Sequence, residues 1–205
     1  MRYKLPYARA GQVVGLLGGS FDPPHEGHAH ITREALKRFK LDQVWWLVSP
    51  GNPLKRRGPA PMDQRLKAAQ SLIDHPKVKI TDLEKQLGSP FTAQTVQHLK
   101  RLYPDVHFVW LMGADNLAQF HQWQDWQTIV ENVPIAVIAR AGQRLGARRS
   151  VMARTYRQFR LTGAKTRLLS RHAAPAWAYQ NVPLVNLSST AIRASGKWNT
   201  KPPSK

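Results

Sequence analysis

The 205-residue sequence contains no cysteine. Disulfide frameworks, cysteine-ligated zinc or iron–sulfur sites and thiol nucleophiles are therefore excluded, and any catalysis uses other side chains. Long apolar runs are also missing, because stretches such as residues 44–48 and 135–139 are far shorter than the roughly 20 residues that span a bilayer. The basic start is followed by the short apolar run 13–17, without the longer apolar region of a signal peptide. We therefore expect a cytoplasmic protein.

Acidic residues are missing from the last third of the chain. All 12 Asp and Glu lie in residues 1–131, whereas residues 132–205 carry 14 Lys and Arg and most of the net charge of +19. Such a charge favours anionic partners, whether nucleotides, nucleic acid or acidic surfaces, without distinguishing them. The plainer interpretation is a solvated basic face, formed by Arg148, Arg149, Arg154, Arg157 and Arg160.

Along the first two thirds of the chain, segments with the apolar pattern of a buried strand alternate with segments with the apolar spacing of a helix. Apolar runs predict strands at residues 12–17, 44–48, 106–112 and 135–139, and the segment VKI predicts a short strand at residues 78–80. Helical spacing predicts helices at 31–39, 62–73 and 93–102, and the Trp-rich segment before the last strand is expected to be helical. The alternation predicts an α/β fold with a Rossmann-like, doubly wound parallel sheet, in which Trp45, Trp46 and Trp110 are core residues.

We expect a single domain over residues 1–205. The apolar pattern weakens between residues 141 and 182, where basic residues and glycines gather, with one amphipathic turn at Met152, Tyr156 and Phe159. This segment is interpreted as a basic, partly irregular insertion that covers the sheet edge before the C-terminal motif.

A glycine-bearing turn joins the first predicted strand to the first predicted helix, and residues 18–28 read GGSFDPPHEGH. Ligands of parallel sheets bind beyond the carboxyl ends of the strands, where a helix N-terminus presents amides to phosphate. His25 and His28 lie three apart on one helical face and can donate to the same anion. A metal-binding pair is the alternative, although no third ligand follows at a zinc spacing. The turn matches neither the dinucleotide fingerprint nor the P-loop, which argues against a dehydrogenase or a P-loop kinase.

Two segments carry a family resemblance. Residues 19–28, GSFDPPHEGH, resemble the G-x-F-D-P-x-H-x-G-H signature of the nucleotidyltransferases that transfer a nucleoside monophosphate from a nucleoside triphosphate. Residues 187–193, LSSTAIR, are similar to the I-S-S-T-x-I-R motif of the same superfamily, in which a helix N-terminus and an arginine hold the triphosphate. Alone, the second segment would be an ordinary helix cap, but the two motifs in this order indicate the superfamily.

Three further segments resemble the bacterial-type nicotinate mononucleotide adenylyltransferases. Residues 49–55, SPGNPLK, are similar to a Pro-rich loop ending in lysine, residues 89–95, SPFTAQT, to a Y-T-x-D-T segment, and GAD at 113–115 followed by Trp123 to a G-x-D…W pattern. The resemblance extends from about residue 13 to residue 193. Four positions depart from the family pattern: Leu54 for His, Phe91 for Tyr, Gln94 for Asp and Ala141 for Pro.

The resemblance implies a reaction in NAD biosynthesis. The 5′-phosphate of nicotinate mononucleotide attacks the α-phosphorus of ATP in line and yields nicotinate adenine dinucleotide and pyrophosphate, without a protein nucleophile. Catalysis then consists of positioning two polyanions and neutralising the leaving pyrophosphate. The expected catalytic residues are His25, His28, Lys55 and Arg193. The expected ATP and phosphate contacts are Gly18, Gly19, Ser20, Phe21, Gly113, Asp115, Ser188, Ser189 and Thr190. The expected contacts to the nicotinate nucleotide are Thr92, Thr95 and Trp123.

The resemblance also implies that the indole of Trp123 stacks on the pyridine ring, while Thr92 and nearby amides recognise the carboxylate. Asp115 is expected to accept from a ribose hydroxyl or a water beside the phosphates, with a helix cap as the alternative. Asp22 either orients the loop or a histidine, or forms an Asx turn before Pro23.

Magnesium is the expected cofactor, held mainly by phosphates and water, so no protein ligand to the metal is predicted. The expected partners are ATP and nicotinate mononucleotide, with no obligatory nucleic acid and no membrane, and a homo-oligomer is left open. One alternative function is a related adenylyl- or cytidylyltransferase that acts on another phosphate or alcohol. A second is a basic nucleic-acid-binding module, which would not explain both phosphate motifs. The sequence leaves the preference between nicotinate and nicotinamide nucleotides open.

Overall fold

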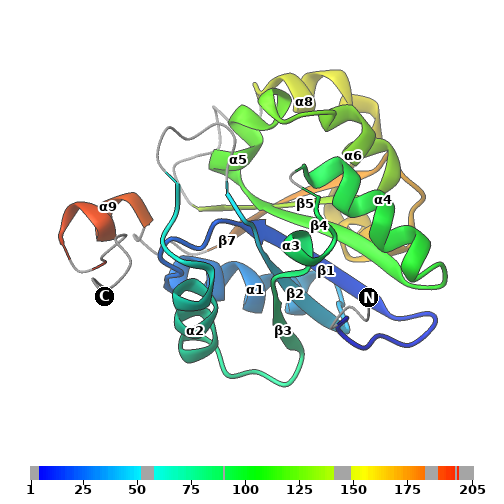
Figure 1. Ribbon diagram of the computed structural model, residues 1–205. Helices are drawn as coiled ribbons and strands as arrows, with labels where there is room; N and C mark the ends of the chain where they lie inside the picture. The colour runs from blue at the N-terminus through cyan, green and yellow to red at the C-terminus, as the bar shows by residue number, and fades with distance from the viewer. Residues whose placement is uncertain are drawn as a thin grey trace.

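The computed structural model describes residues 5–51, 58–89, 91–140, 149–182, 189–196 and 198. Lys55, Arg148, Ser188 and the departures Leu54 and Ala141 lie outside the described residues. The centre of the protein is a seven-stranded sheet in the order β3-β2-β1-β4-β5-β7-β6 (Figure 1). Every pairing between these strands is parallel.

The strands and helices alternate as the sequence predicts. The strands are β1 (Val13–Gly19), β2 (Gln43–Val48), β3 (Val78–Thr81), β4 (His107–Gly113), β5 (Ile135–Arg140), β6 (Arg160–Leu161) and β7 (Trp177–Val182). The α-helices are α1 (Glu26–Arg38), α2 (Met62–Leu72), α3 (Leu83–Gln86), α4 (Thr92–Leu102), α5 (Ala114–Gln119), α6 (Trp126–Asn132), α8 (Val151–Thr155) and α9 (Ser189–Ala194). Short 3-10 helices are η1 (Phe120–Gln122), η2 (Arg157–Phe159) and η3 (Gly163–Arg171). The prediction of a doubly wound α/β fold is confirmed.

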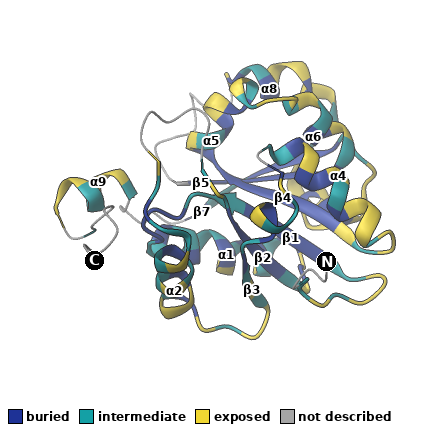
Figure 2. Ribbon diagram, viewed as in Figure 1, coloured by how far each residue is buried: buried dark blue, intermediate teal, exposed yellow. Residues whose placement is uncertain are grey.

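The central strands β1, β2, β4 and β5 are buried on both faces, which explains why they read as continuous apolar runs. Successive strand residues point to opposite faces, so the neighbouring indoles of Trp45 and Trp46 enter different core clusters. Helices α4, α6 and α8 cover one face, and α1 and α2 cover the other (Figure 1). Figure 2 shows the strands as the buried layer between partly exposed helices. Trp45, Trp46 and Trp110 are fully buried core residues, as predicted.

The segment after β5 is more regular than the sequence pattern indicates. Within its described part, residues 149–182, strand β7 pairs with both β5 and β6 and so extends the sheet. The sequence WAYQNV of β7 lacks a continuous apolar run, so it gives no strand signal by itself. The strand is buried because β5 and η3 pack against it. Trp177 fixes the position of β7, since its buried Nε1 donates to the Tyr156 carbonyl at 2.7 Å.

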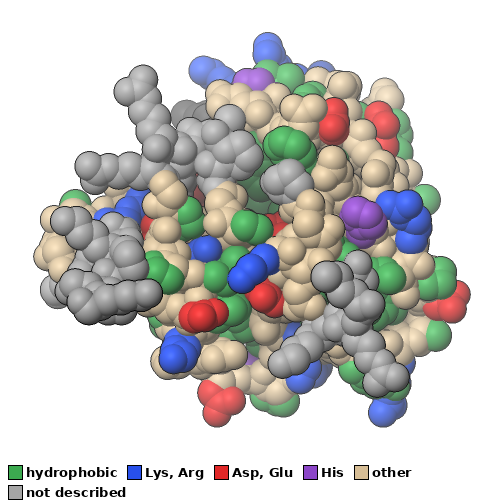
Figure 3. Space-filling view, viewed as in Figure 1, with side chains coloured by type: hydrophobic (Ala, Val, Ile, Leu, Met, Phe, Trp, Pro, Cys, Tyr) green, Lys and Arg blue, Asp and Glu red, His purple; other side chains and the backbone are tan. Residues whose placement is uncertain are grey.

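The basic face is also more structured than expected at one position. Arg149, Arg154 and Arg157 are exposed, as a solvated face requires. Arg160 differs, because its guanidinium lies 5.2 Å from the ring centre of Trp177 and 5.9 Å from that of Tyr179. On the face of the molecule in Figure 3, acidic side chains lie among basic ones. Within the described ranges, no helix is long and apolar enough to cross a bilayer.

The order of the strands creates a crevice at the centre of the sheet. The chain moves outward from β1 through β2 to β3 and then returns to β4 on the other side of β1. Loops that leave the carboxyl ends of β1 and β4 therefore diverge, and ligands of open α/β sheets bind at such a switch point. The histidine-bearing turn follows β1, and the Gly113–Asp115 segment follows β4.

Candidate active site

A cavity of about 480 Å³ opens at this switch point. Its walls come from the carboxyl ends of β1 and β4, the loop after β2, the segments α3 to α4, and α9. A concave site that gathers polar groups at a switch point is the expected place for a nucleotide. The cavity brings together most residues predicted from the sequence: Gly18, Gly19, Ser20, Phe21, His25, His28, Thr92, Gly113, Asp115, Trp123, Ser189 and Thr190.

One predicted glycine is required by a close approach, and a second lies against a side chain. A Cβ atom on Gly18 would lie 2.5 Å from the buried indole of Trp110, so the end of β1 can pass this ring only as glycine. A Cβ atom on Gly113 would overlap Oδ1 of Asp115, whose side chain folds back over the end of β4. These glycines therefore shape the floor of the cavity without a side chain of their own.

The two histidines form a reciprocal cap at the start of α1. Nδ1 of His25 accepts from the Gly27 amide at 3.1 Å, and Nδ1 of His28 accepts from the His25 amide at 3.2 Å. A ring nitrogen that accepts a hydrogen bond carries no proton, which makes Nε2–H the donor of each neutral ring. The ring centres are 4.0 Å apart, so both rings can serve one anionic group.

A buried layer supports His28 from below. Trp46 donates from Nε1 to the Thr32 hydroxyl at 2.8 Å, and that hydroxyl donates to the His28 carbonyl at 2.9 Å. Phe21 stacks on Trp46 at 4.8 Å and lies 4.7 Å from the His28 ring. Phe21 has a φ of 46°, a left-handed conformation that costs a non-glycine residue energy, and its full burial offsets that cost. The histidine rings are therefore held in place by the core.

Arg65, which belongs to none of the sequence motifs, links the loops around the cavity. Only 1% of its surface is exposed. Its guanidinium donates to the carbonyls of Ser20, Ser49 and Ala60, each at 2.7 Å. Burial lowers the pKa of Arg65, and the nearby Asp22 carboxylate raises it in part. One side chain of α2 thus joins the loop after β1 to the loop after β2.

Helix α9 docks onto the same loop after β1. The Ser189 hydroxyl donates to the Pro23 carbonyl at 2.8 Å, and the Arg193 guanidinium donates to the Asp22 carbonyl. The Asp22 carboxylate accepts from the Ala60 amide at 3.2 Å and from Trp198 Nε1 at 2.7 Å, so Asp22 orients the loop and not a histidine. Arg193 is not among the residues that line the cavity, because its guanidinium lies against Asp22. The two predicted phosphate motifs are nevertheless in direct contact.

Helix α4 lies on the opposite side of the strand ends from α9 (Figure 1), and its first residue, together with Trp123, lines the cavity. Trp123 is half-buried and makes edge contacts with Trp110 and Phe120, at centroid distances of 6.1 and 5.2 Å. Thr92 is the first residue of α4, whose N-terminus has no side-chain cap from Phe91. Its first amides are therefore available to an anion.

Thr95 is placed differently from the expectation of a ligand contact. It is fully buried one turn into α4 and does not line the cavity. Its hydroxyl lies 3.2 Å from the Ser89 hydroxyl and 3.3 Å from the Phe91 carbonyl. Thr95 therefore supports the loop that carries Phe91 and Thr92.

Several lining residues were missed from the sequence. Glu84 of α3 lines the cavity with only 6% of its surface exposed, and burial raises the pKa of its carboxyl to about 8. The cavity also contains side-chain amides that no motif contains: Asn116, Gln119, Gln122 and Gln124. Arg65 could have been found, because it falls on the apolar face of the predicted helix 62–73 beside Leu66 and Ala69, where a charged residue needs a partner.

The carboxylates of the cavity fit a metal ion that is bound mainly by the phosphates of the substrates. Within the described ranges, no three His, Asp or Glu residues gather closely enough to bind a metal ion. Asp115 is the exposed carboxylate of the cavity wall, and Glu84 is buried. Magnesium commonly keeps several waters and binds one or two carboxylates together with substrate phosphates, which suits this arrangement.

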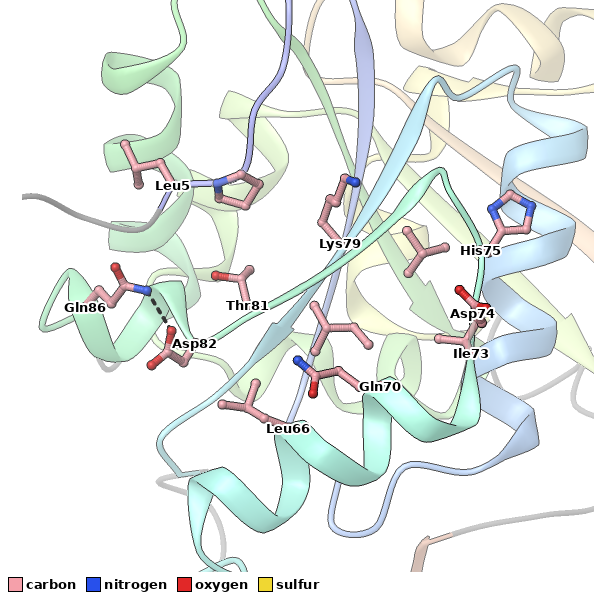
Figure 4. Close-up of a pocket in the computed structure, with 13 residues that line it drawn as sticks. Leu5, Leu66, Gln70, Ile73, Asp74, His75, Lys79, Thr81, Asp82 and Gln86 are labelled. Carbon is pink, nitrogen blue, oxygen red and sulfur yellow. Dashed lines mark hydrogen bonds between the residues drawn. The ribbon is translucent and has the colours of Figure 1, made fainter.

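A second, larger groove of about 750 Å³ lies along the edge strand β3. Leu66 and Gln70 of α2 and Ile73, the residue after this helix, form one wall, and Leu5 lies across the strand (Figure 4). At its end, Gln86 donates to the Asp82 carboxylate at 2.7 Å (Figure 4). None of the predicted site residues lines this groove, so its greater volume does not mark it as the active site.

Comparison with known proteins agrees with this geometry. Residues 16–195 match the cytidylyltransferase-like family. The chain is 59% identical over 199 residues to a protein of Ruegeria pomeroyi named "Probable nicotinate-nucleotide adenylyltransferase", covering 97% of this chain and 93% of that protein. A protein of Rhizobium johnstonii with the same name is 48% identical over 190 residues, covering 92% of this chain and 96% of that protein.

A solved structure shares the fold. Plasmodium falciparum nicotinic acid mononucleotide adenylyltransferase complexed with NaAD superposes with a TM-score of 0.65 at 17% identity, covering 89% of this chain and 83% of that chain. At this identity the likeness establishes the fold alone, and it agrees with the doubly wound sheet described above.

Proposed function

We infer, from the premise that the chain belongs to the cytidylyltransferase-like family, that it is a nicotinate-nucleotide adenylyltransferase of NAD biosynthesis. It joins ATP and nicotinate mononucleotide to give nicotinate adenine dinucleotide and pyrophosphate. The observation that carries this function is that one and the same cavity is lined by the donors of α1 and α9 and by Trp123 and Thr92. Two anionic nucleotides can therefore meet at the switch point of the sheet.

The reaction needs no protein nucleophile. An oxygen of the acceptor's 5′-phosphate attacks the α-phosphorus of ATP, and the bond from that phosphorus to the bridging oxygen breaks. The electron pair of the broken bond leaves with pyrophosphate. His25 and His28 lie beside the amides at the start of α1, and their Nε2–H groups donate to the phosphates between which the bond forms and breaks. Because their rings are fixed by capping bonds and by Trp46 and Thr32, they need little reorganisation during the reaction.

The phosphates of ATP extend toward α9. Ser189 and Thr190 line the cavity there, and Ser188 and Lys55 belong to the same proposed phosphate site by their motifs. Arg193 reaches the leaving pyrophosphate by exchanging its contact with Asp22 for the phosphate. Magnesium, when bound to the phosphates, supplies further neutralising charge, and Asp115 would hold it through a water.

The acceptor lies against Trp123 and α4. The indole face stacks on the pyridine ring, and the uncapped amides at Thr92 donate to its carboxylate. A cytoplasmic location, a single domain over residues 1–205 and the absence of an obligatory nucleic-acid partner remain predictions from the sequence.

A product assay tests the function. With ATP and magnesium, nicotinate mononucleotide should yield the dinucleotide and stoichiometric pyrophosphate, more efficiently than nicotinamide mononucleotide. Phosphopantetheine and glycerol phosphate serve as acceptors for the related transferases. The assignment would be overturned if the protein turned over phosphopantetheine or glycerol phosphate and turned over neither pyridine nucleotide.

A further inference from the structure

We propose that Glu84 is a specificity-determining residue of the acceptor pocket, where its carboxyl group donates a hydrogen bond to the carboxylate of the pyridine ring. This proposal rests on the proposed function, because that function supplies the nicotinate nucleotide. No sequence motif used above contains Glu84.

The backbone around Glu84 places it beside the start of α4. Strand β3 ends at Thr81, whose hydroxyl accepts from the Leu83 amide at 3.1 Å and so starts α3 at the edge of the cavity. The Ser89 amide donates to the Glu84 carbonyl at 3.0 Å, and the Ser89 hydroxyl donates to the Phe91 carbonyl at 3.2 Å. Ser89 thus joins Glu84 to Phe91, and Glu84, Phe91 and Thr92 line one wall of the cavity.

The side chain of Glu84 is almost fully buried. Among the described residues, none donates a hydrogen bond to it or forms an ion pair with it, and its small exposed fraction of 6% belongs to the cavity wall. Burial alone raises its pKa to about 8. At neutral pH the carboxyl group is therefore mainly protonated and has an O–H to donate. An unpaired carboxylate in this buried position would cost much more free energy than the neutral acid.

This wall presents two donors to a ligand. The first is the uncapped N-terminus of α4, an eleven-residue helix whose first amides and dipole favour an anion. The second is the O–H of Glu84. A nicotinate carboxylate has two acceptor oxygens and can satisfy both donors, whereas a nicotinamide group has one acceptor oxygen and an NH₂ that faces a donor. A site built from donors rejects the analogue that cannot accept from both.

Ionised Glu84 reverses this preference. A carboxylate would repel the nicotinate carboxylate and would accept from the NH₂ of nicotinamide. The ratio of kcat/KM for nicotinate over nicotinamide mononucleotide should therefore fall as the pH rises through about 8, the pKa of Glu84. His25, His28 and Asp115 line the same cavity, and β2 and the first turn of α4 contribute no charged side chain. Since both acceptors carry the same phosphate and ribose, other titrations largely cancel in the ratio.

Variants on α3 isolate the effect. Glu84→Met removes the donor at similar length and should narrow the preference by about tenfold, mainly through KM for nicotinate mononucleotide, with KM for ATP unchanged. Glu84→Gln keeps an N–H donor but does not titrate, so its ratio should not change between pH 6.5 and 9. The matched control is Gln86→Met on the same helix, because Gln86 faces the groove along β3 and should leave the ratio and its pH dependence as in the wild type (Figure 4).

The outcomes separate this proposal from the function on which it rests. Equal losses with both acceptors in Glu84→Met, or a wild-type ratio that does not change with pH, would overturn the role of Glu84 and leave the enzyme assignment intact. An equal loss of this kind would indicate that Glu84 binds the ribose that both acceptors share. If the wild type turned over neither pyridine nucleotide, the function and the role of Glu84 would both be wrong. If Glu84→Met failed to fold, the wild-type profile and Glu84→Gln would still decide.

Discussion

The two ends of the cavity are built on different principles. At the phosphate end, His25 and His28 have their backbone-facing nitrogens occupied and rest on the buried layer of Trp46 and Thr32. At the pyridine end, the amides of α4 have no side-chain cap and Glu84 has no partner for its carboxyl among the described residues. Donors that are fixed before the substrate arrives lower the barrier of the chemical step, whereas groups whose hydrogen bonds are unfilled gain most when the correct ligand binds. Changes at the first end should therefore act on kcat and changes at the second end on KM.

The largest effect should come from His28. His28→Ala removes a fixed donor to the reacting phosphates and should lower kcat by about 10²-fold or more, the scale of a lost transition-state donor. Tm should fall by only about 2–4 °C, because the lost ring nitrogen caps the start of α1. Steady-state kinetics and thermal unfolding measure both quantities. The control is His107→Ala, because His107 is exposed at the amino end of β4, far from the cavity. Stoichiometric zinc in the purified protein, with unfolding on chelation, would instead favour the metal-binding interpretation of the two histidines.

Arg193 tests whether α9 belongs to the phosphate end. Arg193→Ala should lower kcat by about tenfold, because a charge placed against the leaving pyrophosphate matters most in the transition state. Arg193→Lys keeps the charge without the planar fork and should recover part of that loss. A rise in the KM for ATP at unchanged kcat would show that Arg193 only binds the ground state. In that case α9 would not belong to the part of the cavity that lowers the barrier of the chemical step.

Trp123 tests the pyridine end. Trp123→Ala removes the stacking surface and should raise the KM for nicotinate mononucleotide about tenfold, with a smaller effect on kcat and none on the KM for ATP. The matched control is Trp126→Ala, since Trp126 packs on Phe120 and Tyr156 and does not line the cavity. If both variants raised the KM for the acceptor equally, the effect would come from the packing of this segment and not from stacking.

The smallest effect should come from the basic face outside both ends. Replacing the exposed Arg149, Arg154 and Arg157 together by Gln should change kcat by less than about twofold and make kcat/KM less sensitive to salt, because screening acts on long-range attraction. Kinetics at low and high ionic strength measure this. A loss of kcat comparable to that of His28→Ala would mean that the active site is misplaced.

The sequence predicts the frame of the fold well and the walls of the cavity less completely. Continuous apolar runs locate β1, β2, β4 and β5, because strands buried on both faces must be apolar along their whole length. The edge strand β3 was predicted from the short segment V-K-I, whose Lys79 is exposed. Strand β7 was not predicted, since the mixed sequence WAYQNV becomes buried only when β5 and β6 pair with it. At the site, the motifs locate the histidines and α9, because the residues of each motif are close together in the sequence.

The partners of Arg65 and the role of Glu84 could not be assigned from local spacing, although the position of Arg65 on the apolar face of its helix marks it as a charged residue that needs a partner. The role of Arg65 depends on three carbonyls that lie 5, 16 and 45 positions away in the chain. The role of Glu84 depends on the burial of its carboxyl in a wall that also includes residues of α1 and α5. Thr95 shows the converse, because a residue within a recognisable motif lies behind the wall and supports it.

The buried charge of Arg65, partly offset by the nearby Asp22 carboxylate, also contributes to the electric field in the cavity. Its positive charge lies one side chain behind Ser20 and Ser49, which line the cavity, and water and counter-ions cannot reach it. Charges on the surface lose their influence within about 8 Å at physiological ionic strength, but a charge in a medium of low permittivity is screened much less. The phosphate end therefore carries a component of positive potential that stays nearly constant when the salt concentration changes, whereas the attraction exerted by the exposed arginines does not.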